Sequence, residues 1–234
     1  MTGALKLVTD DDGLERELEE FNTSDRGRLR IGFVDSSSYE VMPRFLRQYR
    51  SRWPSIEYEL RSMSSDEQYL ALTRGQIDLG IARANQSPME VTSTLILRER
   101  LVLAMPADHP LAHQKRTSIS RLRGEDFLGF DRNVSPSLHT ELTGLFLAHN
   151  VAYDPVIEAT EYTTILGLVA SGQGIAIVPA GVQTFRPPNL RYVGLRNADA
   201  TSELLLLARA DEPSRLVQQA SSLLTDGFRL EDDS

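Results

Sequence analysis

The feature that most constrains this chain is a regular alternation of strand-like and helix-like stretches that begins at Leu29. Residues 29–34, 55–61 and 77–82 are short apolar or alternating runs, which are typical of β-strands. Two helical patterns lie between them. The second one begins at a capping-box sequence, residues 65–68, and ends at Gly75. The first carries apolar residues along one helical face: Met42, Phe45, Leu46, Tyr49 and Trp53. This order predicts an α/β fold with a doubly wound sheet.

The pattern continues in a way that indicates two lobes rather than one. Residues 94–105 form a long strand-like stretch, interrupted by charged residues at 98–100, and a strand this long is able to cross from one lobe to another. Further strands are predicted at 127–130, 155–159, 175–178, 190–195 and 204–208, with helices at 163–169 and 214–228 and around Leu138. We therefore predict two doubly wound lobes joined by two crossing strands. Lobe I comprises residues 28–97 and 196–230, lobe II comprises residues 98–195, and residues 1–27 form a linker with a short helix.

Composition and missing motifs exclude several classes of function. The chain has no cysteine and a net charge of −8, so zinc–cysteine chemistry and a broad nucleic-acid-binding face are not expected. No stretch approaches the roughly 20 apolar residues that span a membrane, and the acidic N-terminus does not resemble a signal peptide, which favours a cytoplasmic protein. The four histidines are scattered, so we expect no metal and no cofactor. Neither a nucleophile motif nor a carboxylate pair for acid–base catalysis is evident, which argues against an enzyme.

Polar side chains follow each of the first three predicted strands. Ser36, Ser37 and Ser38 follow the first strand, Ser64 and Ser65 the second, and Arg83 the third. Because parallel strands end at one edge of a sheet, these groups should converge there and suit a small anion, which a guanidinium binds well. Helix capping explains one serine in each group without a ligand, and an ordinary surface ion pair is the alternative for Arg83.

Several motifs, in order, resemble the regulatory domain of LysR-type transcriptional regulators. They are the entry strand at 27–33, Met-Pro at 42–43 with Trp-Pro at 53–54, the segment 72–81, His-Pro-Leu-Ala at 109–112, and Leu-Val-Ala-Ser-Gly-Gln-Gly-Ile-Ala-Ile-Val-Pro at 168–179. The resemblance covers about residues 28 to 230. It implies two α/β lobes of the type II periplasmic-binding-protein kind, with the ligand held between them.

Within that family the chain looks most like regulators of aromatic-compound breakdown, which bind benzoate- or muconate-like acids. That resemblance implies an effector site for a small aromatic or dicarboxylic acid, in which Tyr162 is bulkier than the usual aliphatic residue. With the residues at the strand ends, the predicted effector-site residues are Ser36, Ser37, Ser38, Ser64, Ser65, Arg83, Pro136, Leu138, Tyr162, Thr163 and Leu204.

One departure from the family concerns DNA. Family members begin with a winged helix-turn-helix domain and a linker helix, and this chain carries neither in full, so we expect DNA contact only through a domain that is either excised or lost. The resemblance also implies a homodimer or homotetramer whose subunit arrangement changes when the effector bridges the lobes. Two alternatives stay open. A solute-binding protein of the same fold is disfavoured by the missing signal peptide, and a dehydratase-type enzyme by the missing acid–base pair.

Overall fold

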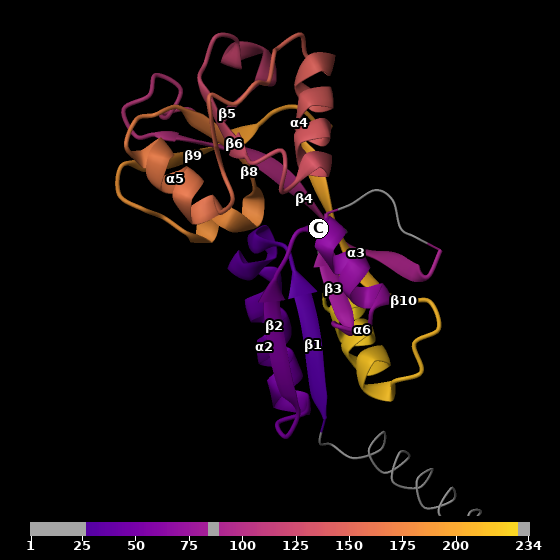
Figure 1. Ribbon diagram of the computed structural model, residues 1–234. Helices are drawn as coiled ribbons and strands as arrows, with labels where there is room; N and C mark the ends of the chain where they lie inside the picture. The colour runs from indigo at the N-terminus through magenta and orange to yellow at the C-terminus, as the bar shows by residue number, and fades with distance from the viewer. Residues whose placement is uncertain (1–26, 84–88, 229–234) are drawn as a thin grey trace, which may run out of the picture.

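The structure, a computed structural model, describes residues 27–83 and 89–228. These residues form two α/β lobes arranged end to end, as the sequence predicted (Figure 1). The short helix predicted within residues 1–27 lies outside the described residues, Gly27 excepted. Among the described helices, none is long and apolar enough to cross a membrane.

Lobe I is built on a sheet with the strand order β2-β1-β3-β10-β4, in which β1 runs parallel to β2 and β3, while β10 is antiparallel to β3 and β4. Helices α2 and α6 pack on one face of this sheet, and α3 packs on the other. The elements of this lobe are β1 (Arg28–Phe33), η1 (Asp35–Tyr39), α2 (Val41–Arg52), β2 (Glu57–Ser62), α3 (Ser65–Thr73), β3 (Leu79–Ala82), β10 (Thr201–Arg209) and α6 (Arg215–Phe228).

Lobe II has β8 at its centre, parallel to β6 and antiparallel to β4, with β7 beyond β6 and β9 on the other side of β4. Helix α4 packs on one face of the sheet and α5 on the opposite face, so each lobe is a three-layer α/β unit. Its elements are β5 (Arg116–Thr117), η2 (Ile119–Leu122), β6 (Phe127–Phe130), α4 (Pro136–Ala148), β7 (Ile157–Ala159), α5 (Tyr162–Ala170), β8 (Ile175–Pro179), η3 (Ala180–Thr184) and β9 (Leu190–Leu195).

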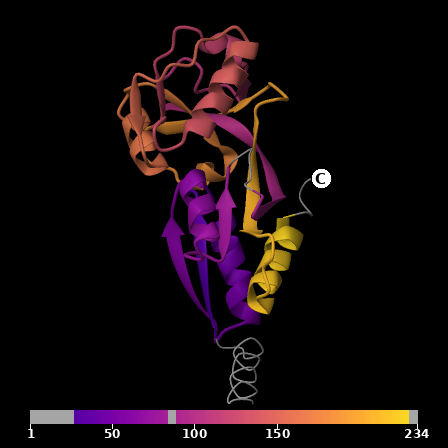
Figure 2. The same ribbon diagram turned by 45° about the vertical axis from the view of Figure 1, so that its right-hand side comes forward.

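One strand, β4 (Val91–Pro106), belongs to both lobes. Its first part, up to Arg100, pairs with β10, and the part from Leu101 onward pairs with β8 and β9. Figure 2 shows this long strand and β10 passing together between the lobes. The charged residues at 98–100, which suggested an interruption, lie within a continuous strand at the point where it changes sheets. Arg98 is exposed at this junction, whereas Glu99 is buried in an ion pair with Arg83.

Two details of the sequence reading need correction. Helix α3 has its capping box one residue earlier than predicted: the Ser64 hydroxyl accepts a hydrogen bond from the Glu67 N–H, and the Glu67 carboxylate accepts one from the Ser64 N–H at 2.7 Å. Leu60, an apolar member of the alternating run, is 39% exposed, because β2 is the edge strand of its sheet. The positive φ of Gly75, +64°, confirms the predicted end of this helix.

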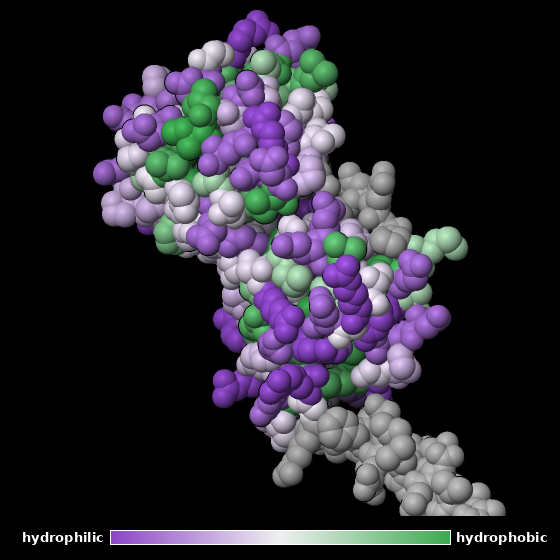
Figure 3. Space-filling model, viewed as in Figure 1, coloured by the Kyte–Doolittle hydropathy of each residue, from purple (hydrophilic) through white to green (hydrophobic). Residues whose placement is uncertain are grey.

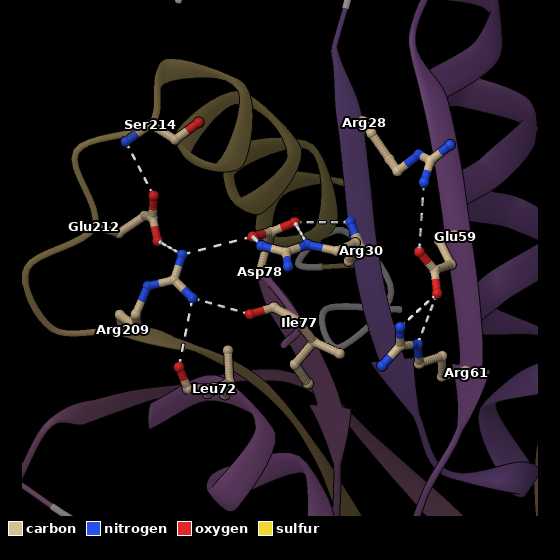
Figure 4. Close-up of polar contacts among 10 residues, drawn as sticks. All are labelled: Arg28, Arg30, Glu59, Arg61, Leu72, Ile77, Asp78, Arg209, Glu212 and Ser214. Carbon is tan, nitrogen blue, oxygen red and sulfur yellow. Dashed lines mark hydrogen bonds and ion pairs between the residues drawn. The ribbon is translucent and has the colours of Figure 1, made fainter. Parts of the chain in front are cut away.

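The third apolar run, residues 77–82, contains one acidic residue, Asp78, and the structure explains it. Asp78 is buried, and its carboxylate accepts two hydrogen bonds from the Arg30 guanidinium, at 2.7 and 3.0 Å, and one from the Arg30 N–H. The guanidinium of Arg209 lies 3.6 Å from the Asp78 carboxylate and also forms an ion pair with Glu212 (Figure 4). The Glu212 carboxylate in turn accepts a hydrogen bond from the Ser214 N–H. This network joins β1, β3 and the connection from β10 to α6 at the end of lobe I opposite lobe II.

The surface in the view of Figure 3 is largely hydrophilic, with apolar patches that are small and separate. The apolar residues are instead concentrated in four buried clusters, two in each lobe. Each lobe therefore has its own core, which leaves the polar junction between them as the place where the lobes meet.

Candidate functional site

A cavity of about 110 Å³ lies at the junction of the two lobes. The carboxyl ends of β1, β2 and β3 form one wall, and the N-terminal ends of α4 and α5 form the other. Ligand sites favour this edge of a parallel sheet. The lining residues are Val34, Asp35, Ser36, Ser62, Met63, Ser64, Ser65, Arg83, Phe130, Val134, Ser135, Leu138, Thr160 and Tyr162.

The structure brings six of the predicted site residues together around this cavity. Lobe I contributes the ends of its three parallel strands, and lobe II contributes the first turns of two helices. The six residues are Ser36, Ser64, Ser65, Arg83, Leu138 and Tyr162.

Five other predicted residues do not line the cavity. The hydroxyls of Ser37 and Ser38 donate to the carbonyls of Val34 and Asp35, at 2.8 and 2.6 Å, and so close the turn of η1. Pro136 begins helix α4, Thr163 is exposed on α5, and Leu204 is fully buried in the lobe I core.

Arg83 is buried, and its guanidinium is already engaged by the protein. Nε donates to the Ser36 hydroxyl at 2.9 Å, Nη1 donates to the Ser202 hydroxyl at 2.9 Å, and Nη2 forms an ion pair with the Glu99 carboxylate. The second oxygen of Glu99 accepts a hydrogen bond from the N–H of Gly181, in η3 of lobe II, at 3.0 Å. The arginine that was predicted to clamp a ligand therefore takes part in a network that joins η1, the end of β3, β4, β10 and lobe II.

A second carboxylate approaches the same guanidinium from lobe II. Burial raises the pKa of the Glu141 carboxyl, while the positive charge of Arg83 and a hydrogen bond with Ser202 act in the opposite direction. Glu141 lies on α4, whereas Arg83 and Ser202 belong to lobe I and its crossing strand. The interlobe junction is thus a compact group of one cation and two carboxylates.

The serines that line the cavity have structural partners as well. Ser64 caps helix α3, and the Ser65 hydroxyl accepts from the Arg83 N–H at 3.1 Å and lies 3.2 Å from the Arg83 carbonyl, to which it donates. The Ser36 hydroxyl accepts from the guanidinium of Arg83. Ser135 is different: it is the N-cap residue of α4, yet its side chain makes no capping hydrogen bond.

Asp35 was missed by the sequence reading as a cavity residue. One oxygen of its carboxylate, Oδ2, accepts the N–H of Tyr162 at 3.0 Å, so a lobe I carboxylate binds the first residue of α5 in lobe II. Burial raises the pKa of the Asp35 carboxyl, and the negative charge of Glu161 acts in the same direction. The signal was present in the sequence, since Asp35 is the only charged residue directly after the first strand, beside the three serines.

Aromatic contacts close the seam next to the cavity. The Tyr39 ring of η1 lies 6.5 Å from the ring of Tyr162 and 6.4 Å from that of Phe185, both in edge-to-face arrangements. The Thr184 hydroxyl of η3 donates to the Tyr39 carbonyl at 3.3 Å. These contacts, and the Asp35–Tyr162 bond, hold the lobes in the arrangement that the structure shows. Within residues 27–83 and 89–228, no group of three or more metal-ligating side chains is placed to bind a metal.

Comparisons with known proteins agree with this geometry. A family model described as "LysR substrate binding domain" matches residues 22–229. The HTH-type transcriptional regulator BenM of Acinetobacter baylyi is 32% identical over 216 residues, which cover 92% of this chain and 71% of BenM. The HTH-type transcriptional regulator CatR of Pseudomonas putida is 33% identical over 196 residues, which cover 84% of this chain and 67% of CatR.

A solved structure extends the likeness to three dimensions. The BenM effector binding domain with its effector benzoate superposes with a TM-score of 0.80 at 30% identity, covering 90% of this chain and 96% of that one. The chain spans between 64% and 71% of the length of the first curated relatives that it matches.

Proposed function

Because the chain belongs to the LysR substrate binding domain family, whose members are transcription regulators and not enzymes, we propose that it senses a small organic acid in the interlobe cavity. Aromatic and dicarboxylic acids are the candidate effectors. The observation that carries the proposal is the composition of the cavity, which both lobes line and which combines hydroxyls with an apolar wall. The related BenM domain was solved with benzoate as its effector, which supports an acid of similar size.

The proposed mechanism is a shift between two arrangements of the lobes. A ligand that touches both walls stabilises one arrangement over the other only to the extent that it binds the two with different affinity. The contacts that such a shift has to rearrange are the Asp35–Tyr162 bond, the Glu99–Gly181 bond and the Tyr39 ring contacts. The change would reach DNA through a helix-turn-helix domain like that of the full-length relatives and through a homodimer or homotetramer.

The proposal can be tested by blocking the cavity from an exposed position. Val134 lines the cavity and is 37% exposed, so a larger side chain there should fill the ligand space without entering a core. Val156 is 60% exposed and does not line the cavity, which makes it a matched control. Isothermal titration calorimetry with benzoate and with cis,cis-muconate compares the parent chain, Val134→Trp and Val156→Trp.

We expect Val134→Trp to lose binding and Val156→Trp to bind as the parent chain does, with thermal midpoints of both variants close to the parent value. If Val134→Trp binds the acid with unchanged affinity, the cavity is not the effector site. If the parent chain binds no acid, including acids outside this pair, the proposed function is wrong.

A further inference from the structure

The carboxylate of Asp35 gives the cavity a charge that a simple organic acid does not match. Oδ2 accepts the Tyr162 N–H, and within the described residues Oδ1 has no hydrogen-bond partner and the carboxylate has no cationic partner. The charged residue that acts on it is a second carboxylate, Glu161. A half-buried carboxylate with a free oxygen favours a ligand group that donates hydrogen bonds and carries positive charge.

Arg83 does not compensate for this negative charge. Its three guanidinium nitrogens are engaged by Ser36, Ser202 and Glu99, and the Glu141 carboxylate lies close enough to interact with it as well. The charges around the cavity therefore sum to a negative value. A dicarboxylate would add two further negative charges there, and burial makes such repulsion costly.

The opposite wall offers donors and apolar contacts. Helix α4 spans 13 residues, and the side chain of its N-cap residue, Ser135, makes no capping bond, which leaves the hydroxyl available to a ligand carboxylate beside the first turn of the helix. The apolar part of the lining suits a branched or aromatic side chain. It consists of Val34, Met63, Phe130, Val134, Leu138 and the Tyr162 ring.

We propose that the effector is a zwitterion of the α-amino acid class with an apolar or aromatic side chain, whose ammonium group binds Oδ1 of Asp35. The ammonium places its charge against Asp35, and the carboxylate lies toward the hydroxyls and the start of α4. This inference rests on the proposed function, because it assigns the class of ligand for the same cavity. It makes Asp35 the residue that distinguishes an amino acid from the corresponding simple acid.

Matched ligand pairs separate this inference from effector binding in general. L-Phenylalanine and 3-phenylpropanoate share a carbon skeleton and differ by the ammonium group, as do L-leucine and 4-methylpentanoate. Calorimetry at neutral pH measures all four, together with benzoate, on the full chain. The variants are Asp35→Asn, which keeps the shape and removes the charge, and Asp154→Asn, an exposed control outside the cavity.

We expect the parent chain to bind at least one of the amino acids about tenfold or more tightly than its ammonium-free counterpart. Asp35→Asn should lose this preference while Asp154→Asn keeps it, and the thermal midpoint of each variant confirms that it is folded. The inference is overturned if the simple acid binds as tightly as the amino acid, if Asp35→Asn keeps the preference, or if benzoate binds and neither amino acid does. In each of these cases the proposed function stands, whereas absence of binding by every acid in the panel would remove both.

Discussion

Replacing Glu99 by alanine removes the carboxylate that faces the buried guanidinium of Arg83. The two side chains are 6% and 10% exposed, so this is a buried ion pair. The variant leaves Arg83 with the hydroxyls of Ser36 and Ser202 and with the nearby Glu141 carboxylate, which forms no ion pair with it, and it also leaves the Gly181 N–H without its acceptor. Breaking a buried pair from one side costs about 3–5 kcal/mol, because a charge is left buried and uncompensated.

A neighbouring ion pair, between β4 and β10, supplies the control for this prediction. Glu203 pairs with Arg98, and these side chains are 48% and 53% exposed. Glu203→Ala should therefore cost no more than about 1 kcal/mol, since solvent screens an exposed pair. Urea denaturation at neutral pH, followed by far-ultraviolet circular dichroism, measures the free energy of unfolding of both variants and the parent chain.

A double variant separates the charge from the packing. Arg83→Met combined with Glu99→Leu removes both charges and keeps apolar volume, so it should be more stable than Glu99→Ala alone. The reasoning is refuted if Glu99→Ala and Glu203→Ala destabilise the chain to the same extent. It is also refuted if the double variant is less stable than Glu99→Ala.

Three further predictions concern the helix start beside the cavity, the interlobe carboxylate and a close backbone contact. Ser64→Ala should lower the free energy of unfolding by about 1 kcal/mol in denaturant titrations, because it removes the N-cap hydroxyl of α3. Burial raises the pKa of Glu141 above its ordinary 4.5. The protonated carboxyl therefore contributes to stability below pH 4.5, and this contribution is lost as the pH rises through the pKa that Glu141 has in the folded chain. The thermal midpoint of Glu141→Gln should therefore rise relative to that of the parent chain as the pH rises from 4.5 to neutrality. Gly174→Ala should unfold at markedly lower urea concentration than the parent, since the backbone has a φ of +149° there and a Cβ would lie 2.4 Å from the Asp126 carbonyl oxygen.

The order of elements could be predicted from the sequence because each lobe repeats a strong local pattern. The runs at 127–130 and 190–195 matched their strands residue for residue, since short runs with apolar residues that are bounded by polar ones favour strands. Boundaries shifted where local signals competed. Two adjacent serines could each begin α3, and the reciprocal bond to Glu67 selects Ser64 rather than Ser65.

The position of Arg83 could be predicted, but its partners could not. A residue directly after a buried strand has to lie at the edge of the sheet, so its place beside the cavity followed from the pattern. The partners of Arg83 depend on the pairing of β4 with β10, which sets Ser202 opposite Glu99 although Ser202 is 119 residues from Arg83 in the chain. Leu204 failed as a cavity residue for the same reason, because the strand register turns its side chain into the lobe I core.

A crystal structure of the full chain with the acid that calorimetry finds to bind most tightly would show whether the interlobe cavity is the effector site. We expect electron density for the ligand between the two lobes, in contact with the strand ends at Ser36 and Ser64 and with the start of α4 at Ser135 and Leu138. Density for the ligand at a site that only one lobe lines, with the interlobe cavity unoccupied, would contradict it.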